Sequence, residues 1–248
     1  MDDSFTLFAV AFAAFLLAGL VKGVIGLGLP VVAIGLLALV MSPAQAAALL
    51  VIPSLATNMW QVVAGPQFLA LVRRLGLVLV GIVAGIGLSP SLLTSDTSGW
   101  ATFALGVALA LYAVLGLTAV RFRIPPRAEP WAGPLVGLAT GAVAAATGIF
   151  AIPSVPYLQA IGLEKDDLVQ ALGLIFTVST VALGIVLARD GVLSTSTAGA
   201  SLMALVPALG GMVAGQLIRS RIKPAVFRLI FLWGLLALGV HLAVHAAL

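Results

Sequence analysis

The sequence predicts an all-α polytopic membrane protein that consists of two inverted-topology repeats of about five helical segments each. The first reason is composition: of the 248 residues, 62% are apolar and only 8% are charged, whereas soluble domains have roughly 25% charged residues. The second reason is that the apolar residues form segments long enough to span a membrane. The third is a long polar stretch at the middle of the chain, with five apolar segments on each side.

The apolar segments are bounded by charges, prolines and turn residues. A transmembrane helix needs about 20 apolar residues, and most segments reach that length, which predicts eight to ten full spans. The second segment is interrupted by glycines and Pro30, and the seventh is short and contains Pro153. We therefore expect a broken or re-entrant helix at the start of each half. The ten segments are 5–21, 24–41, 43–65, 75–93, 99–120, 131–147, 149–162, 168–188, 195–218 and 224–247.

Basic residues predict the orientation of these segments. When the segments alternate strictly across the membrane, eleven of the 12 Lys and Arg residues fall on one side, and only Arg189 falls on the other. Cytoplasmic loops of membrane proteins are rich in Lys and Arg, so this side is predicted to be cytoplasmic and both termini to lie outside. The expected location is the plasma (inner) membrane. Topology thus accounts for the net charge of +4, and no nucleic-acid partner is expected.

The middle polar stretch divides the chain into two repeats within one integral membrane domain. An odd number of segments per half inserts the two halves with opposite orientation, as in inverted-repeat transporters. Glycine spacing agrees with this division, because Gly19 and Gly23 precede the first helix break. Gly137 and Gly141 precede the second break at the same spacing. The predicted units are a first repeat, 1–120, a cytoplasmic linker, 121–130, and a second repeat, 131–248.

The two helix breaks, at 23–30 and 146–153, are the first candidates for a binding site. Within a bilayer, freed backbone groups persist only in buried protein or beside a water-filled cavity. Paired breaks in two repeats mark substrate sites in transporters. Two helix N-termini converging from opposite sides would suit a small anion, because each carries a partial positive charge. The alternative is that Gly26, Gly28 and Gly148 only permit close helix packing.

Polar side chains align on one face of the segment 43–65, at spacings of three and four residues. Further polar residues occupy the corresponding stretch of the second half. These groups could solvate an anion without a fixed charge, or they could hydrogen-bond between helices, at about 0.6 kcal/mol per bond. They are Ser54, Thr57, Asn58 and Gln61 in the first half and Gln170, Thr177, Ser179 and Thr180 in the second.

Lys22 lies beside the first break. It either extends to the cytoplasmic interface or attracts and binds an anion. No Asp or Glu falls inside a predicted segment, which disfavours a proton relay and an intramembrane hydrolase, whereas sodium coupling and passive flux stay open. The chain has no Cys, and His241 and His245 alone would make a poor metal site. No metal or other cofactor is expected.

Three stretches of the first half resemble the TauE/SafE family of sulfite exporter-like permeases. They are GLVKGVIGLGLP at 19–30, SPAQAAALL at 42–50 and PSLATNMWQ at 53–61. The stretch from Gly141 to Pro153 is similar to the second-half motif of the family. It departs from the first motif in having alanines, Ala144 and Ala146, at two glycine positions. The likeness covers roughly residues 5–247.

The resemblance implies a permease, not an enzyme, that exports a small sulfur-containing oxyanion such as sulfite, sulfoacetate or a related organosulfonate by alternating access. An anion channel, a carrier for another small organic anion and a non-transporting membrane scaffold are the alternatives. Expected partners are the anionic substrate and the lipid bilayer, and a homo-oligomer is left open. The motifs assign substrate binding to Gly26, Gly28, Pro30, Thr57, Asn58, Gln61, Thr147, Gly148 and Pro153, and the residues themselves add Lys22, Thr177 and Thr180.

The predicted topology can be tested with accessibility tags. A tag at Arg127 should be reached by a membrane-impermeant reagent only from the cytoplasmic side, because the linker carries several arginines. Tags at both termini should be reached from outside. A C-terminus that is labelled only from the cytoplasm would contradict the inverted repeat.

Overall fold

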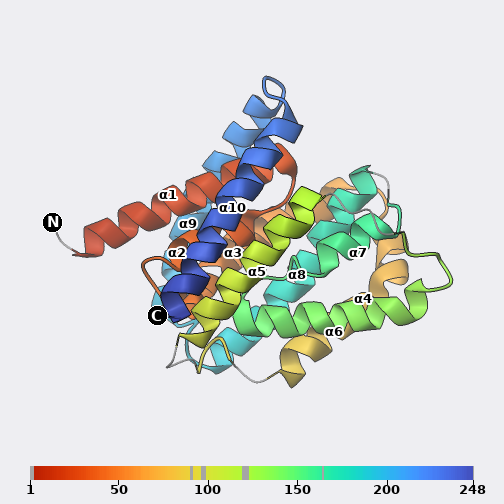
Figure 1. Cartoon of the computed structure of the whole chain (residues 1–248), viewed down its shortest axis with the longest axis horizontal. Helices are drawn as coiled ribbons and strands as arrows, with labels where there is room; N and C mark the ends of the chain where they lie inside the picture. The colour runs from red at the N-terminus through yellow and green to blue at the C-terminus, as the bar shows by residue number, and fades with distance from the viewer. Residues whose placement is uncertain (1–2, 90–91, 96–98, 119–122, 164, 248) are drawn as a thin grey trace.

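In the computed structural model, the chain is described except for residues 1–2, 90–91, 96–98, 119–122, 164 and 248. The described residues form ten α-helices and no β-strand, so the all-helical fold is confirmed for them (Figure 1). The first two residues of the predicted linker lie outside the described residues. The helices are α1 (Asp3–Ile25), α2 (Leu29–Leu37), α3 (Pro43–Ala64), α4 (Phe68–Leu88), α5 (Trp100–Thr118), α6 (Glu129–Thr147), α7 (Ser154–Ala160), α8 (Lys165–Arg189), α9 (Thr195–Arg219) and α10 (Pro224–Ala247).

Seven helices in the described part of the chain are long and apolar enough to cross a membrane. This number is below the predicted eight to ten. The helices α2 and α7 have only 9 and 7 residues, about 14 and 11 Å of axis. The helix α6 has 19 residues, but it contains two prolines and many Gly, Ala and Thr residues. The seven candidate spans are α1, α3, α4, α5, α8, α9 and α10.

The start of α3 follows a local sequence signal, whereas the start of α4 depends on a distant contact. The helix α3 begins at a capping box, in which the Ser42 hydroxyl accepts from the backbone N–H of Gln45 and the Gln45 side chain accepts from the Ser42 N–H. The helix α4 begins at Phe68, seven residues before the predicted start. Its early arginines are accommodated because Arg74 forms a 2.7 Å ion pair with Glu129.

The helix pairs α1 with α9 and α4 with α6, like the pair α5 with α10, pack with their backbones in direct contact. A Cβ placed on Gly19 would lie 2.1 Å from the carbonyl oxygen of Ala208, and one on Gly211 would lie 2.0 Å from that of Leu16. Only glycine permits so close an approach. Gly211 and Gly215 therefore pack within the chain, whereas a Cβ added to Gly210 would have no atom within 4 Å.

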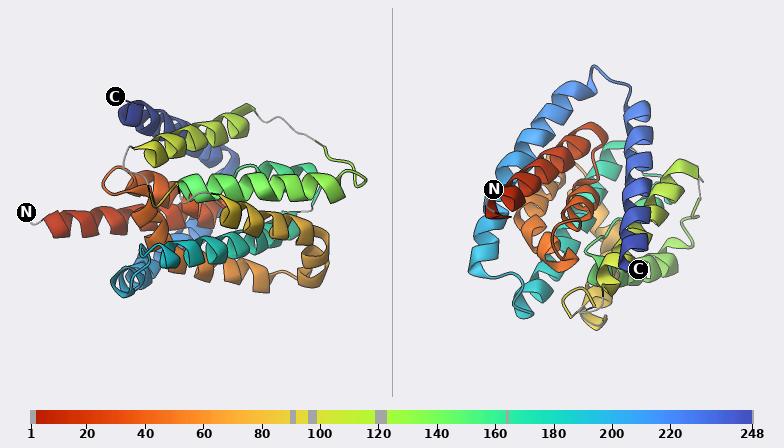
Figure 2. Two further views of the ribbon diagram at one scale, coloured as in Figure 1. Left: turned by 90° about the horizontal axis from the view of Figure 1, so that it is seen from below. Right: turned by 60° about the vertical axis from the view of Figure 1, so that its left-hand side comes forward.

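The pair α4 and α6 repeats the same arrangement with the same glycine spacing. A Cβ on Gly85 would lie 2.3 Å from the Leu138 carbonyl oxygen, and one on Gly141 would lie 2.3 Å from that of Ile82. The remaining long helices form the pairs α5 with α10 and α3 with α8. Figures 1 and 2 show α5 and α10 side by side, at the edge of the bundle.

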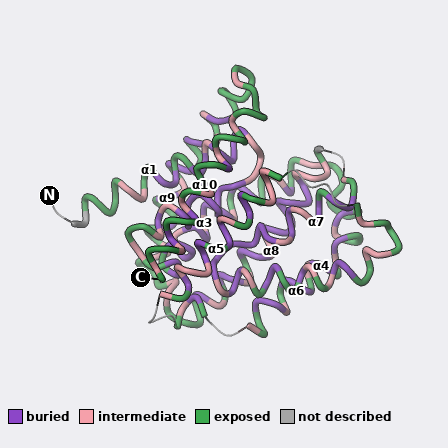
Figure 3. Tube along the Cα trace, viewed as in Figure 1, coloured by how far each residue is buried: buried purple, intermediate pink, exposed green. Residues whose placement is uncertain are grey.

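The core lies where α2, α3, α7 and α8 meet, and the outward faces of the helices are apolar as well. Figure 3 shows buried stretches where helices adjoin and exposed stretches on the outside. Among the exposed side chains are large apolar ones, such as Val206 and Leu217. Such a surface fits lipid, whose chains are as apolar as the protein core.

Both predicted helix breaks are present. The chain leaves α1 at Gly26 and enters α2 after Gly28, and both glycines have a positive φ, at 90° and 108°. The second break runs from Gly148, with φ 74°, to a cis peptide bond before Pro153. Positive φ favours glycine because it has no Cβ. The alanines of the second motif remain helical in α6, so the second break begins one turn later than the motif comparison indicates.

Most basic side chains lie at one end of the bundle, which we call the basic end. Contacts bring together the C-terminal ends of α3 and α5 with the N-terminal ends of α4, α6, α8 and α10. Arg189 lies at the opposite end, where its neighbour Asp190 accepts a 2.6 Å hydrogen bond from Thr94. The described basic residues at or beside the basic end are Arg73, Arg74, Arg123, Arg127, Arg219, Arg221, Lys223 and Arg228.

Two glycines of α4 allow a matched test of the backbone contact. Gly85→Ala should lower the melting temperature in detergent, because the added Cβ would overlap the Leu138 carbonyl oxygen and overpacking costs about 1–3 kcal/mol. Gly87 has no atom within 4 Å of the added Cβ, so Gly87→Ala should leave the melting temperature unchanged or slightly raised. Equal melting temperatures for the two variants would contradict the close α4–α6 contact.

Candidate functional site

Lys22 turns into the bundle and is buried, with only 3% of its surface exposed. It lies on α1 one turn before the first break, and its neighbour Gly23 packs against the backbone of α9. The Nζ atom donates a 3.0 Å hydrogen bond to the hydroxyl of Thr57 and a second hydrogen bond to the side-chain oxygen of Asn58. The side-chain nitrogen of Lys22 is therefore held against α3, inside the bundle.

The hydrogen bonds continue from Asn58 across α3 to α8. The Asn58 amide nitrogen donates to the Ser54 hydroxyl at 3.0 Å, and that hydroxyl lies 3.1 Å from the hydroxyl of Thr180. All these side chains are buried. Lys22, Thr57, Asn58, Ser54 and Thr180 thus form one polar cluster, which joins α1, α3 and α8; we call it the lysine cluster.

The lysine cluster contains one basic group, Lys22, and no carboxylate among the described residues. The ion pair between Arg74 and Glu129 is the only one in the described part of the chain. An ammonium group has three N–H donors and no acceptor, and Lys22 uses two of them on neutral side chains. Burying an unpaired charge is unfavourable. The cluster is consequently a place where a small anion would be stabilised.

Gln61 connects the lysine cluster to the first break. Its amide nitrogen donates a 2.7 Å hydrogen bond to the carbonyl oxygen of Gly26, which the break has released from the α1 hydrogen-bond ladder. Its side-chain oxygen is buried and has no partner among the described residues. Gln61 therefore presents an unused acceptor one turn along α3 from Asn58.

Thr177 and Gln170 make structural contacts rather than contacts with the lysine cluster. The Thr177 hydroxyl donates to the Gly173 carbonyl oxygen of its own helix. The Gln170 amide nitrogen donates to the carbonyl oxygens of Val62 and Gly65, and its oxygen accepts from the backbone N–H of Gln67. Gln170 thereby holds the turn between α3 and α4 against α8.

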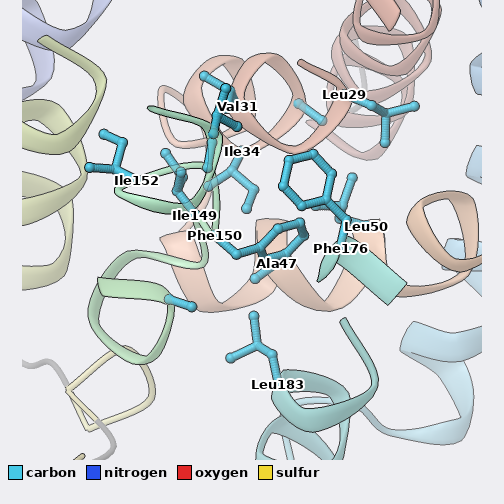
Figure 4. Close-up of a cluster of buried hydrophobic side chains, with 14 of the residues drawn as sticks. Leu29, Val31, Ile34, Ala47, Leu50, Ile149, Phe150, Ile152, Phe176 and Leu183 are labelled. Atoms are coloured by element: carbon cyan, nitrogen blue, oxygen red, sulfur yellow. The ribbon is translucent and has the colours of Figure 1, made fainter. Parts of the chain in front are cut away.

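The two helix breaks contact different turns of α3, whereas residues that follow both breaks, such as Leu29, Ile149 and Phe150, lie in one apolar cluster (Figure 4); convergence of two helix N-termini on one anion stays a prediction. The first break contacts Gln61 on α3. The second break contacts the other end of α3, where a Cβ on Gly148 would lie 3.2 Å from that of Ala47. Fourteen residues separate Gln61 from Ala47, about 21 Å of helix axis. Within the described residues, Thr147, Gly148 and Pro153 form no hydrogen bond with the lysine cluster.

The second break is embedded in an apolar cluster, shown in Figure 4. Ile149 and Phe150 are buried, and the Phe150 ring lies 5.0 Å, centroid to centroid, from the ring of Phe176. Phe176 is one turn from Thr180 on α8, and its carbonyl oxygen accepts from the Thr180 hydroxyl. The apolar cluster therefore adjoins the lysine cluster at Phe176 and Thr180. Thr147 bonds only local backbone groups there.

Sequence reasoning did not identify two buried hydroxyls. Pro53 interrupts α3 and has no N–H to bond the Leu49 carbonyl, and Ser201 of α9 donates to that carbonyl at 2.8 Å instead. The proline signals the freed carbonyl, but the sequence does not indicate its partner. Thr140 of α6 is buried with no partner for its hydroxyl among the described residues. In the described ranges, no group of three or more His, Asp or Glu residues could hold a metal ion.

The protein is a multi-pass membrane protein with an internal polar site. This class follows from the apolar helices, the break between α1 and α2, and the buried lysine cluster. Within this class the sequence comparison is specific. The family model described as Sulfite exporter TauE/SafE matches residues 11–242. The chain belongs to this family of membrane transporters, which confirms the resemblance of its motifs. Comparisons with curated proteins and with solved structures give no match.

The structural role of Gln170 can be separated from a role in binding. Gln170→Leu should lower the melting temperature, because it leaves the carbonyls of Val62 and Gly65 without their donor, at about 1–3 kcal/mol for each buried group left unpaired. Gln216→Leu, on the exposed surface of α9, is the control. A Gln170→Leu variant as stable as this control would contradict the role of Gln170 at the α3–α4 turn.

Proposed function

We propose that the protein is a secondary permease of the plasma membrane that exports a small sulfur-containing oxyanion, sulfite or an organosulfonate such as sulfoacetate. The observation that carries this proposal is the buried ammonium group of Lys22, which contacts neutral side chains and no carboxylate. Membership of the sulfite exporter family supports a sulfur anion as the substrate. The lysine cluster is the proposed binding site.

The groups of the cluster match the chemistry of such an anion. Sulfite and sulfonate oxygens accept hydrogen bonds, and the ammonium of Lys22 can donate to them. A charge-assisted hydrogen bond is stronger than a neutral one, and the low dielectric of the bundle increases the attraction further. Thr57 and Asn58 hold the ammonium in place. An arriving anion would replace part of these contacts.

Helix pairing supports the inverted repeat that alternating access requires. If α1 to α5 correspond in order to α6 to α10, then the pair α1–α9 corresponds to the pair α6–α4. Both pairs are observed, and both pack through glycines four residues apart. The other two long pairs, α3–α8 and α5–α10, each join a helix to its own counterpart. The two breaks lie toward opposite ends of the bundle, as a two-fold axis in the membrane plane would place them.

We interpret the structure as a state closed toward the opposite end, with a cavity at the basic end that extends to the residues flanking the first break. The apolar cluster around Phe150 and Phe176 covers the lysine cluster on one side. A cavity of about 510 Å³ opens at the basic end. The high density of Arg and Lys there favours a cytoplasmic location. We infer that the chain is in a cytoplasm-facing conformation, ready to receive an anion for export.

Flux through the purified protein in proteoliposomes tests this function. Sulfite, sulfoacetate, thiosulfate, sulfate and acetate are compared, each with and without a sodium gradient. We expect saturable flux of a sulfur oxyanion. Lys22→Met should reduce it at least a hundredfold, because the variant retains much of the side-chain length but has no charge for the anion. Asn58→Ala should also reduce flux. Lys223→Met, which removes an exposed lysine, is the matched control and should transport normally.

Each alternative function has a different outcome in this assay. Saturable flux of acetate without flux of sulfur anions would indicate a carrier for another organic anion. Flux that does not saturate would indicate a channel. The absence of flux from folded wild-type protein would contradict the permease and favour a scaffold. Normal flux of a sulfur anion through Lys22→Met would keep the permease but overturn the assignment of its site.

A further inference from the structure

The cavity at the basic end carries charge that the proposed binding site does not use. It has a volume of about 510 Å³, within the range of small-molecule sites. Its wall is formed by the ends of α1, α5, α8 and α10, by α7 and by the polar linker. Most of the lining is apolar. Four side chains add polar groups: Arg123, Arg228, Tyr112 and Gln159.

Among the described residues, the charges in the cavity wall have one sign. The described lining includes the guanidinium groups of Arg123 and Arg228 and no carboxylate. Neither arginine forms an ion pair with any residue in the described part of the chain. The one hydrogen bond of Arg228 runs over 3.4 Å to the carbonyl oxygen of Gly116. Both arginines therefore keep donors free for a ligand.

The backbone places each arginine at the cavity by a separate contact. Ile124, the residue after Arg123, donates its N–H to the carbonyl oxygen of Ala160 at the end of α7, at 3.0 Å. Arg228 lies just over one turn into α10, which packs along α5. The linker and α10 thus bring their guanidinium groups to the same cavity from positions that are far apart in the sequence.

The inner wall of the cavity adjoins the first helix break. Ile25 and Leu27 line the cavity and flank Gly26, whose carbonyl oxygen is bonded by Gln61. Lys22 is one turn earlier on α1. The cavity therefore ends where the lysine cluster begins, separated from it by the break and by Gln61.

We propose that this cavity is an anion-capture site, in which Arg123 and Arg228 bind the substrate oxyanion before it passes the first break to Lys22. The proposal rests on the proposed permease function. A cleft of one charge sign with apolar walls concentrates counter-ions and raises association rates by about 10- to 1,000-fold. Arginine suits this role because its planar group can donate two parallel hydrogen bonds to an oxyanion. The linker then contributes to transport as well as joining the halves.

Kinetics of the double variant R123Q/R228Q test the capture site. Flux is measured in proteoliposomes sorted for orientation, with sulfite or sulfoacetate supplied at the basic end. We expect KM to rise about tenfold or more, while kcat stays within about twofold. The salt dependence of kcat/KM should become weaker, because capture is electrostatic. The matched control is R219Q/R221Q, which removes two exposed arginines outside the cavity lining and the same net charge.

The outcomes separate this proposal from the permease proposal. Wild-type protein without flux would overturn the permease function itself. Wild-type flux with the same KM and salt dependence in R123Q/R228Q as in R219Q/R221Q would overturn the capture site alone, leaving the arginines with a role in membrane topology only. Melting temperature and labelling at position 127 check folding and orientation. If the double variant fails to insert, R123Q, which changes one exposed loop residue, provides the same comparison.

Discussion

A polar group inside a bilayer has no water to bond, so each charge and each freed carbonyl of this chain needs a partner within the bundle. This constraint connects the main features of the structure. The Gly26 carbonyl released by the first break is bonded by Gln61, and the Leu49 carbonyl released by Pro53 is bonded by Ser201. Lys22 differs from these carbonyls, because its hydrogen-bond partners are neutral and do not balance the charge of an ammonium group. The site proposed for the anion is the place where this constraint is met only in part.

Glycine contacts between helices allow the polar groups to meet. The helices α1 and α9, and likewise α4 and α6, approach until a Cβ would overlap a carbonyl oxygen. At that separation the α1 backbone brings Lys22 against α3, and α6 carries the second break against α2 and α3. Apolar side chains then close one side of the lysine cluster through Phe150 and Phe176. The other side leads toward the cavity at the basic end, where the described lining is cationic. The glycine contacts between helices therefore fix both the position of the lysine cluster and the position of the cavity beside it.

Much of the fold could be predicted because each signal is local. Capping at Ser42 and the glycines at 26, 28 and 148 mark a helix start and both breaks in the sequence itself. The start of α4 could not be predicted in this way, because the ion pair that admits Arg74 into the helix involves Glu129, 55 residues later. The polar face of α3 is visible from its spacing. The contact between this face and Lys22 could not be predicted. The sequence allowed Lys22 either to extend to the interface or to bind an anion, because residue spacing does not show which helix packs against α3.

The sequence by itself determined the membrane class, the helical segments, the breaks and the family, since these depend on composition, periodicity and motifs along one stretch of chain. Only the tertiary structure decided which groups share a site. It joined Lys22 with Asn58 and Thr180 and gave Thr147, Gly148 and Pro153 contacts outside that cluster. The tertiary structure also places Arg123 and Arg228, which in the sequence indicate only topology, in the wall of a cavity. The physical reason is that such contacts are set by helix packing between distant segments, which leaves no local trace in the sequence.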